Sequence, residues 1–172
     1  MNTDFKYLLD GSFDPASRVW VYQASRLFSL QEALQIEESL HQFTAAWKSH
    51  GAQVKGAAYL FFGQFIILMA DERATGVSGC STDSSVHLIK QVEKEYDVNM
   101  FDRTILTFVK NEKLERLPMS QLQYGVDNGF ITAETLFFNN SVQTKEELEN
   151  SWLIPVGKSW LGSRIKLSDA KS

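Results

Sequence analysis

The sequence predicts an α+β fold of the ferredoxin-like type, with two helices on one face of an antiparallel sheet and a C-terminal α/β extension. Three observations lead to this prediction: alternating apolar residues in short runs, two stretches with helical spacing, and a glycine turn between two apolar runs. In chain order, the expected βαββαβ elements are a strand at 18–24, a helix between Ser29 and Gly51, strands at 53–62 and 65–70, a helix at 84–96 and a strand at 104–109.

The first strand and helix carry the clearest local signals. Val19 and Val21 alternate with Trp20 and Tyr22, so the two pairs should lie on opposite faces of a strand. We expect the two aromatic residues to form core beneath the C-terminal extension. Ser29 with a glutamate three residues later is a capping box, which predicts a helix start.

The helix that begins at Ser29 carries one apolar stripe at intervals of three and four residues, formed by Ala33, Ile36, Leu40, Phe43 and Trp47. Gly51 suits the left-handed residue that follows a helix. Beyond it, Gly63-Gln64 suits a two-residue hairpin turn between two strands. Asp71-Glu72-Arg73, after the second of these strands, predicts a solvated turn with a local ion pair; paired carboxylates there would also suit acid/base chemistry or a hard cation.

The C-terminal part predicts an extension that packs on the first part. The patterns indicate a strand at 114–117, a helix at 119–127, a strand at 130–138 and a short helix from a Thr144–Glu147 capping box to Ser151. The tail beyond Trp152 is too apolar for a free segment. We therefore expect residues 1–172 to form a single domain, in which 18–110 is the βαββαβ unit and 111–172 is the extension.

Composition argues against several functional classes. The net charge is −4, which disfavours nucleic-acid binding because that binding depends on lysine and arginine neutralising phosphates. The longest apolar run, 57–69, is interrupted and too short to span a bilayer. A single cysteine cannot form an internal disulfide, and the N-terminus lacks a signal-peptide pattern. These features predict a soluble, cytoplasmic protein.

Residues 76–85 are the segment in which a binding site is most strongly indicated. Small and hydroxyl-bearing residues lead there into the expected second helix, and a helix start favours anions. Such a composition is also typical of any loop that ends in a helix cap. The candidate ligand-binding residues are Gly79, Ser81, Thr82, Ser84 and Ser85.

A catalytic arrangement is possible in the same segment. Cys80 could act as a nucleophile with His87 as its base, while Asp83, four residues before His87, orients the imidazole. Backbone N–H groups of residues 81–84 would then serve as oxyanion donors. The alternative is a purely structural role, in which Cys80 is a small buried residue and His87 lies on a solvated side of the helix. The histidines show no metal-type spacing, so we expect no metal site and no cofactor.

Residues 18–23 and 78–85, together with Phe101-Asp102-Arg103, resemble a family of uncharacterised proteins from Bacteroidetes-type bacteria. The resemblance covers most of the chain and implies a bacterial, cytoplasmic protein. Members of this family are often labelled automatically as ABC transporter ATPases, which implies Walker motifs. Gly157-Lys158-Ser159 is the only fragment of such a motif, and Trp152 stands where its first glycine is needed. The ATPase activity is therefore not carried over.

The sequence thus supports two hypotheses from different classes. The first is a non-enzymatic domain that binds a small molecule, an anion or a protein through residues 76–85. The alternative is a small enzyme that uses Cys80 as its nucleophile. Self-association into a homodimer is a further prediction, because an aromatic-rich sheet with an uncovered face exposes a large apolar patch.

Overall fold

The computed structural model describes residues 1–167 and divides them into two compact units. The first, which we call the helix-covered unit, comprises residues 4–102 and 142–149. The second, the C-terminal unit, comprises residues 1–3, 103–141 and the chain from 150 onward. None of the helices within residues 1–167 is both long enough and apolar enough to cross a membrane.

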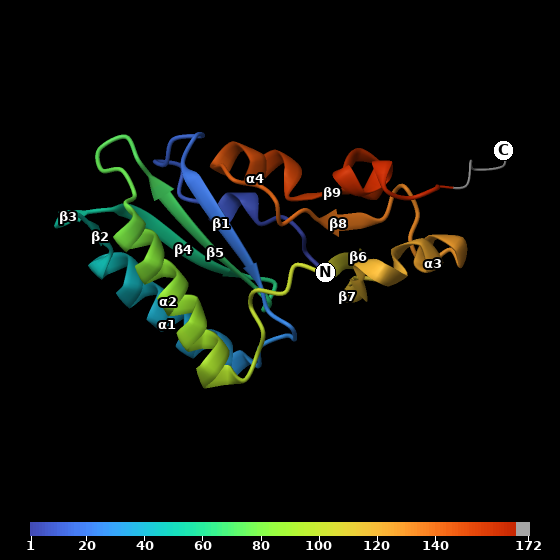
Figure 1. The fold of residues 1–172 in the computed structure, drawn as a ribbon, viewed down its shortest axis with the longest axis horizontal. Helices are drawn as coiled ribbons and strands as arrows, with labels where there is room; N and C mark the ends of the chain where they lie inside the picture. The colour runs from blue at the N-terminus through green and yellow to red at the C-terminus, as the bar shows by residue number, and fades with distance from the viewer. Residues whose placement is uncertain (168–172) are drawn as a thin grey trace. The chain divides into compact units, whose positions relative to one another are not determined.

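The helix-covered unit places two long helices side by side on one face of a three-stranded sheet (Figure 1). Its elements are η1 (Lys6–Leu8), β1 (Arg18–Gln23), α1 (Leu30–Ala46), β2 (Lys48–Ser49), β3 (Ala52–Gln53), β4 (Lys55–Phe61), β5 (Phe65–Asp71), α2 (Gly79–Tyr96) and the start of α4 (Lys145–Ser151). The strand order is β1-β5-β4, and both pairings are antiparallel.

The predicted four-stranded ferredoxin-like sheet is therefore incomplete. Three of its strands lie together, but the fourth, β6 (Ile105–Lys110), belongs to a separate sheet. The reason is that β6 finds partners on both sides nearer in sequence. It forms a hairpin with β7 (Lys113–Pro118) through Asn111 and Glu112, which both adopt positive φ, and it pairs with β8 (Leu136–Phe138) on its other side.

Alternation along the strands separates the two faces of the three-stranded sheet. Tyr22, Ile66 and Leu68 are buried against α1 and α2, and Trp20 packs against the same core. Trp20 and Tyr22 therefore belong to the helix-covered face, and not beneath a C-terminal extension as expected from the sequence. β5 is buried at all of its residues, as its continuous apolar run predicts.

The start of α1 confirms the predicted capping box, whereas its end differs from the prediction. The Ser29 side chain accepts from the Glu32 N–H, and the Glu32 carboxylate accepts from the Ser29 N–H. The helix stops at Ala46, and the chain turns back through the β2–β3 hairpin. Gly51 does adopt positive φ, but with His50 in that hairpin turn, because two consecutive left-handed residues make a tight turn and not a helix cap.

Two other predicted boundaries also move. The β4–β5 connection contains three residues, since Phe61 pairs with Phe65, and both Phe62 and Gly63 have positive φ. The second helix begins at Gly79 and not at residue 84, because Ser78 caps it. Most of the 76–85 segment is therefore helical, whereas the sequence predicts a loop that leads into the helix.

An N-terminal arm, residues 4–17, packs on the unit through aromatic and charged contacts. The rings of Phe5 and Phe61 lie 5.6 Å apart, and the Lys145 ammonium donates to the Phe13 carbonyl at 3.0 Å. The Tyr59 hydroxyl accepts from the Asp10 N–H at 3.1 Å. The arm and the start of α4, which are far apart in sequence, thus meet.

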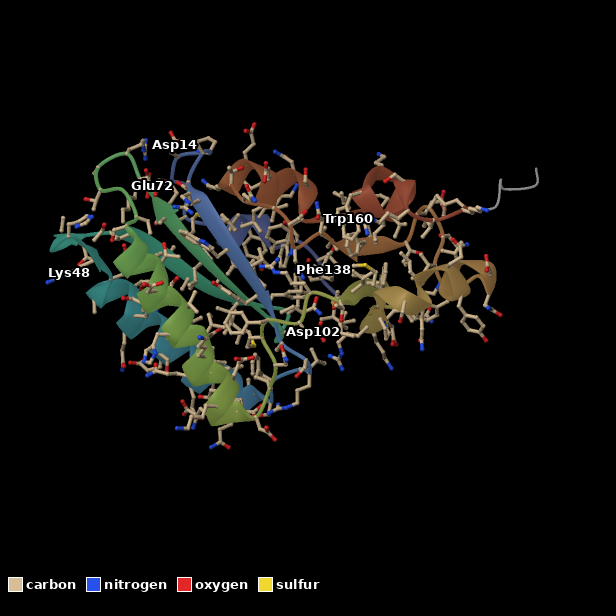
Figure 2. All side chains as sticks on the ribbon, in the orientation of Figure 1. Asp14, Lys48, Glu72, Asp102, Phe138 and Trp160 are labelled. Atoms are coloured by element: carbon tan, nitrogen blue, oxygen red, sulfur yellow. The ribbon has the colours of Figure 1, made fainter. Side chains whose placement is uncertain are left out.

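A buried carboxylate anchors the arm to the end of the sheet. Asp71 is only 2% exposed. It accepts hydrogen bonds from the Arg73 guanidinium and from the Asp14 N–H, and it forms an ion pair with the Lys55 ammonium at 3.6 Å. The Arg73 guanidinium holds the pKa of Asp71 well below its usual range. The predicted local ion pair is present, but its carboxylate is buried and not solvated. Figure 2 shows Asp14 and Glu72 at this same end of the sheet.

The C-terminal unit has a four-stranded sheet and a core of its own. Its sheet has the order β7-β6-β8-β9, with β9 at Leu153–Pro155. The helical turns of this unit are η2 (Met119–Gln121), α3 (Leu122–Asp127), η3 (Val156–Lys158) and η4 (Trp160–Ser163). Its core consists of buried Leu106, Phe108, Leu122, Val126, Ile131, Phe137, Val156 and Leu161. Val156 and Leu161 confirm that the apolar tail packs, and Gly157-Lys158-Ser159 lies in a short turn of this packed segment.

We predict that Asp71→Asn lowers the free energy of unfolding by about 2 kcal/mol, because it leaves Arg73 and Lys55 without their buried partner. The loss should depend on pH. The folded pKa of Asp71 is lowered, so its contribution is present above the aspartate pKa of the unfolded chain, about 3.9, and disappears as the pH falls below it.

Urea denaturation of the parent protein and of the Asp71→Asn variant at several pH values measures this effect. Asp14→Asn is the matched control, because Asp14 contacts the same arginine at 3.7 Å but is one third exposed. Equal losses in the two variants, or an Asp71→Asn loss that is the same at pH 3 and pH 7, would contradict the account.

Candidate functional site

The segment predicted to bind a ligand forms the capped start of α2. The Ser78 side chain accepts from the Ser81 N–H, and the Ser81 side chain accepts from the Ser78 N–H. Because serine replaces the usual glutamate or glutamine at the third helical position, the capping box is not apparent from the sequence. Residues 79–85 therefore lie on a regular helix and do not form a loop.

Most hydroxyls of this segment satisfy the backbone of the helix itself. The hydroxyls of Ser81 and Thr82 both donate to the Ser78 carbonyl at 3.1 Å, and that of Ser85 donates to the Thr82 carbonyl at 2.6 Å. Ser81 and Ser85 are also buried. The N–H groups of Ser81 and Thr82 bond to Ser78 and are engaged, so they are not the oxyanion donors that the sequence suggested.

Two further predicted residues lie in the same turns. Gly79 is the first residue of α2 and is exposed. Cys80 follows it on the helix, and its side chain lies outside the described part of the structure. Ser84 is exposed and lines a groove, described next, that the other predicted hydroxyl residues do not line.

A groove of about 790 Å³ runs between α1 and α2. It is lined by Ser39, Gln42, Phe43 and Ala46 of α1, by Trp47 and Lys48 after it, and by Asp83, Ser84, His87, Leu88 and Gln91 of α2. This volume lies within the range of small-molecule sites in proteins. We call it the interhelical groove.

Hydrogen bonds connect α1 and α2 at both ends of the helix pair. At the end nearer the groove the Trp47 indole N–H donates to the Ser81 carbonyl at 3.0 Å. At the other end the Arg26 guanidinium bonds to the Glu32 carboxylate and to the Tyr96 carbonyl. Arg26 holds the pKa of Glu32 at about 2, so this carboxylate is ionised and the contact persists at neutral pH. The walls of the groove are therefore fixed by contacts outside its opening.

The floor of the groove is apolar and its rim is polar. Phe43 and Trp47 lie with ring centroids 5.0 Å apart, and Leu88 is nearly buried beside them. Trp47 is held from below by Gly56, where a Cβ atom would come within 2.6 Å of its ring. The rim carries the exposed side chains of Gln42, Lys48, Asp83, His87 and Gln91.

Asp83 and His87, proposed from the sequence as partners, share the α2 wall of this groove. Within residues 1–167, however, His87 contacts Gln91 at 3.2 Å between side-chain nitrogens, one turn further along, and does not bond to Asp83. Both side chains are exposed. The geometry thus gives two polar groups on a binding surface and no aligned acid/base pair.

Sequence reasoning missed the α1 side of the site. Phe43 and Trp47 belong to the apolar stripe that the sequence predicts for the first helix, and no sequence pattern indicates Lys48 as a site residue. The signal in the sequence for this wall was the position of the aromatic residues at the end of the apolar stripe. A large aromatic side chain in the last turn of a helix can line a groove beside that helix. Figure 2 shows Lys48 at the β2–β3 end of the unit, directed away from the sheet.

Comparison of the chain with protein-family models, with curated proteins and with solved structures found no significant match in any of the three.

We predict that Trp47→Phe lowers the free energy of unfolding by about 1.5 kcal/mol, because it removes the donor to the buried Ser81 carbonyl and leaves space in the core. It should also displace amide resonances in the first turns of α2. Urea denaturation and two-dimensional NMR measure the two effects. Trp20→Phe is the control, since Trp20 is only partly buried. If the amide resonances of α2 are displaced equally in both variants, the proposed role of Trp47 in holding the two helices together is contradicted.

Proposed function

We propose that this chain is a non-enzymatic binding domain that holds a small molecule in the interhelical groove. The observation that carries the proposal is the groove itself, a ligand-sized cavity of about 790 Å³ between two helices pinned at both ends. A preformed cavity binds without first reorganising the protein, which reduces the entropic penalty of association.

The floor favours a flat apolar group. The partly exposed ring of Phe43 offers apolar surface inside a polar rim, and the buried side chains of Trp47 and Leu88 adjoin it. An aromatic ring placed there would bury its faces and gain ring–ring contacts. A purely charged ligand such as inorganic phosphate would leave this floor uncovered, so the groove suits a molecule with both apolar and polar parts.

The rim favours a molecule that carries both charges. Lys48 and Asp83 both line the groove, and in the part of the chain that the structure describes the side chain of neither forms a hydrogen bond or an ion pair with another residue. An anionic group can contact the Lys48 ammonium while a cationic group contacts the Asp83 carboxylate. We therefore infer a small zwitterionic ligand with an aromatic or branched apolar body, a class that includes aromatic amino acids.

Three probes that share an indole ring test this proposal. L-Tryptophan carries both charges, indole-3-propionate only the negative charge, and tryptamine only the positive charge. Titrated to roughly 5 mM in two-dimensional NMR experiments, L-tryptophan should displace amide resonances of the groove residues and bind about threefold to fivefold more tightly than either analogue.

Variants separate the contributions of the two charges. Lys48→Ala should remove the preference over tryptamine, and Asp83→Asn should remove the preference over indole-3-propionate. His41→Ala, an exposed histidine of α1 that does not line the groove, is the control and should bind as the parent does. If none of the three probes displaces groove resonances, the binding function is rejected. Displacement without a charge preference rejects the zwitterionic class alone.

The alternative function is a small enzyme with Cys80 as its nucleophile. One observation favours it: α2 begins at Gly79, so Cys80 lies in the first turn of an 18-residue helix, where the helix dipole favours a thiolate. Asp83 and His87 lie on the same helix, along the groove.

We predict for this alternative that Cys80 reacts with iodoacetamide with an apparent pKa below the usual cysteine value of about 8.5. The rate of alkylation against pH, followed by mass spectrometry, gives this pKa. His87→Ala should raise it if the imidazole assists the thiol, and His41→Ala is again the control. An apparent pKa at or above 8.5, or a thiol that does not react in the folded protein, rejects the enzyme.

A further inference from the structure

The two edges of the three-stranded sheet differ. At the β1 edge, the Val19 N–H donates to the Gln143 carbonyl at 2.9 Å, and Arg18 forms a bridge with Thr144. At the β4 edge, residues 55–60 pair with β5 on one side, and in the described chain no other backbone pairs with them on the other side. The β4 edge is thus open along its whole length, whereas the β1 edge is closed at its start, at Arg18 and Val19.

This open edge lacks the features that usually prevent strand pairing. Charged side chains, prolines and bulges serve that purpose in natural sheets. The centre of β4 is Ala57-Ala58-Tyr59-Leu60, and its register with β5 is regular throughout. The one charged residue of the strand, Lys55, lies at its start and is drawn toward Asp71 at 3.6 Å.

The surface beside this edge is apolar. A cavity of about 290 Å³ lies between α1 and β4, lined by Leu8, Glu37, Leu40, His41 and residues 58–61. Leu34, one turn before Glu37 on α1, is 60% exposed, and Leu8 is 52% exposed. Large apolar side chains next to an unpaired strand indicate a surface that is covered in a complex.

We propose that two copies of this chain form a symmetric dimer in which β4 pairs antiparallel with β4 of the partner subunit, joining two three-stranded sheets into one. An open edge selects an extended strand as its partner, and a two-fold axis brings the same strand of a second copy to it in antiparallel orientation. Pairing near Tyr59 would also bring the two α1 helices alongside each other and cover Leu34.

Complementary polar groups support a second copy as the occupant, because the Glu37 carboxylate can accept a hydrogen bond from the N–H of a His41 imidazole. Glu37 and His41 are one helical turn apart on the side of α1 that faces the open edge. In two antiparallel α1 helices related by a two-fold axis, each Glu37 lies toward the partner subunit's His41. The interhelical groove lies on the other side of α1, at Ser39, Gln42 and Phe43, so the dimer and the groove are independent of each other.

Sedimentation velocity of the full chain tests the dimer over a concentration range of roughly 1 to 200 μM. The parent should change from monomer to dimer within this range. Glu37→Lys removes the carboxylate that accepts from His41, and His41→Glu places two carboxylates opposite each other, so each should weaken dimerisation about tenfold. The double variant Glu37→Lys/His41→Glu places a lysine opposite a glutamate and should restore it.

Glu38→Lys makes the same charge change on the next residue of α1 and is the matched control. Residues 37, 38 and 41 are all exposed, so the variants should fold, which circular dichroism checks. A parent that stays monomeric at the highest concentration overturns the proposal. A Glu38→Lys variant as weak as Glu37→Lys, or a double variant that stays monomeric, overturns the pairing geometry on which the proposal depends.

Discussion

The position of the Trp47 side chain is the constraint on which most of the helix-covered unit depends. Its backbone N–H caps the end of α1, and its carbonyl accepts from the Val54 N–H, which leads the chain into β4. Its indole packs against Gly56, where no side chain fits, and donates to the Ser81 carbonyl of α2. One residue therefore fixes the end of the first helix, the start of an edge strand and the start of the second helix, and the groove exists because these three are held apart and aligned.

The elements that the sequence predicts well are those with local causes. The Ser29–Glu32 capping box, the buried run of β5 and the Thr144–Glu147 cap each depend on residues within a few positions of one another, and the structure contains all three. The sheet partner of β6 depends on a competition between a ferredoxin-like position and a nearby hairpin. Loop closure favours the hairpin, and no pattern within residues 104–109 indicates that preference.

The candidate site shows the same division. Asp83 and His87 are four residues apart, so helical spacing was enough to place them on one side of α2. Phe43, Trp47 and Lys48 join them only because α1 stops at Ala46 and packs beside α2, which depends on tertiary contacts. The serines near Cys80 are candidate ligand-binding residues in the sequence, but the hydroxyl of a serine at a helix start can form a hydrogen bond either with a ligand or with the backbone of its own helix. Here Ser81 and Ser85 satisfy the backbone.

The packing of residues 142–149 with the arm also bears on how the chain is made. The helix-covered unit is discontinuous in sequence: the Lys145 ammonium reaches the Phe13 carbonyl, and the Gln143 carbonyl closes the edge of β1. Synthesis from the N-terminus produces α1, α2 and their sheet long before this segment leaves the ribosome. The β1 edge of the first 102 residues therefore stays unpaired while the intervening C-terminal strands are translated. A nascent chain stalled before residue 142 would expose both edges of its three-stranded sheet. Aggregation should therefore be most strongly favoured at this stage of synthesis.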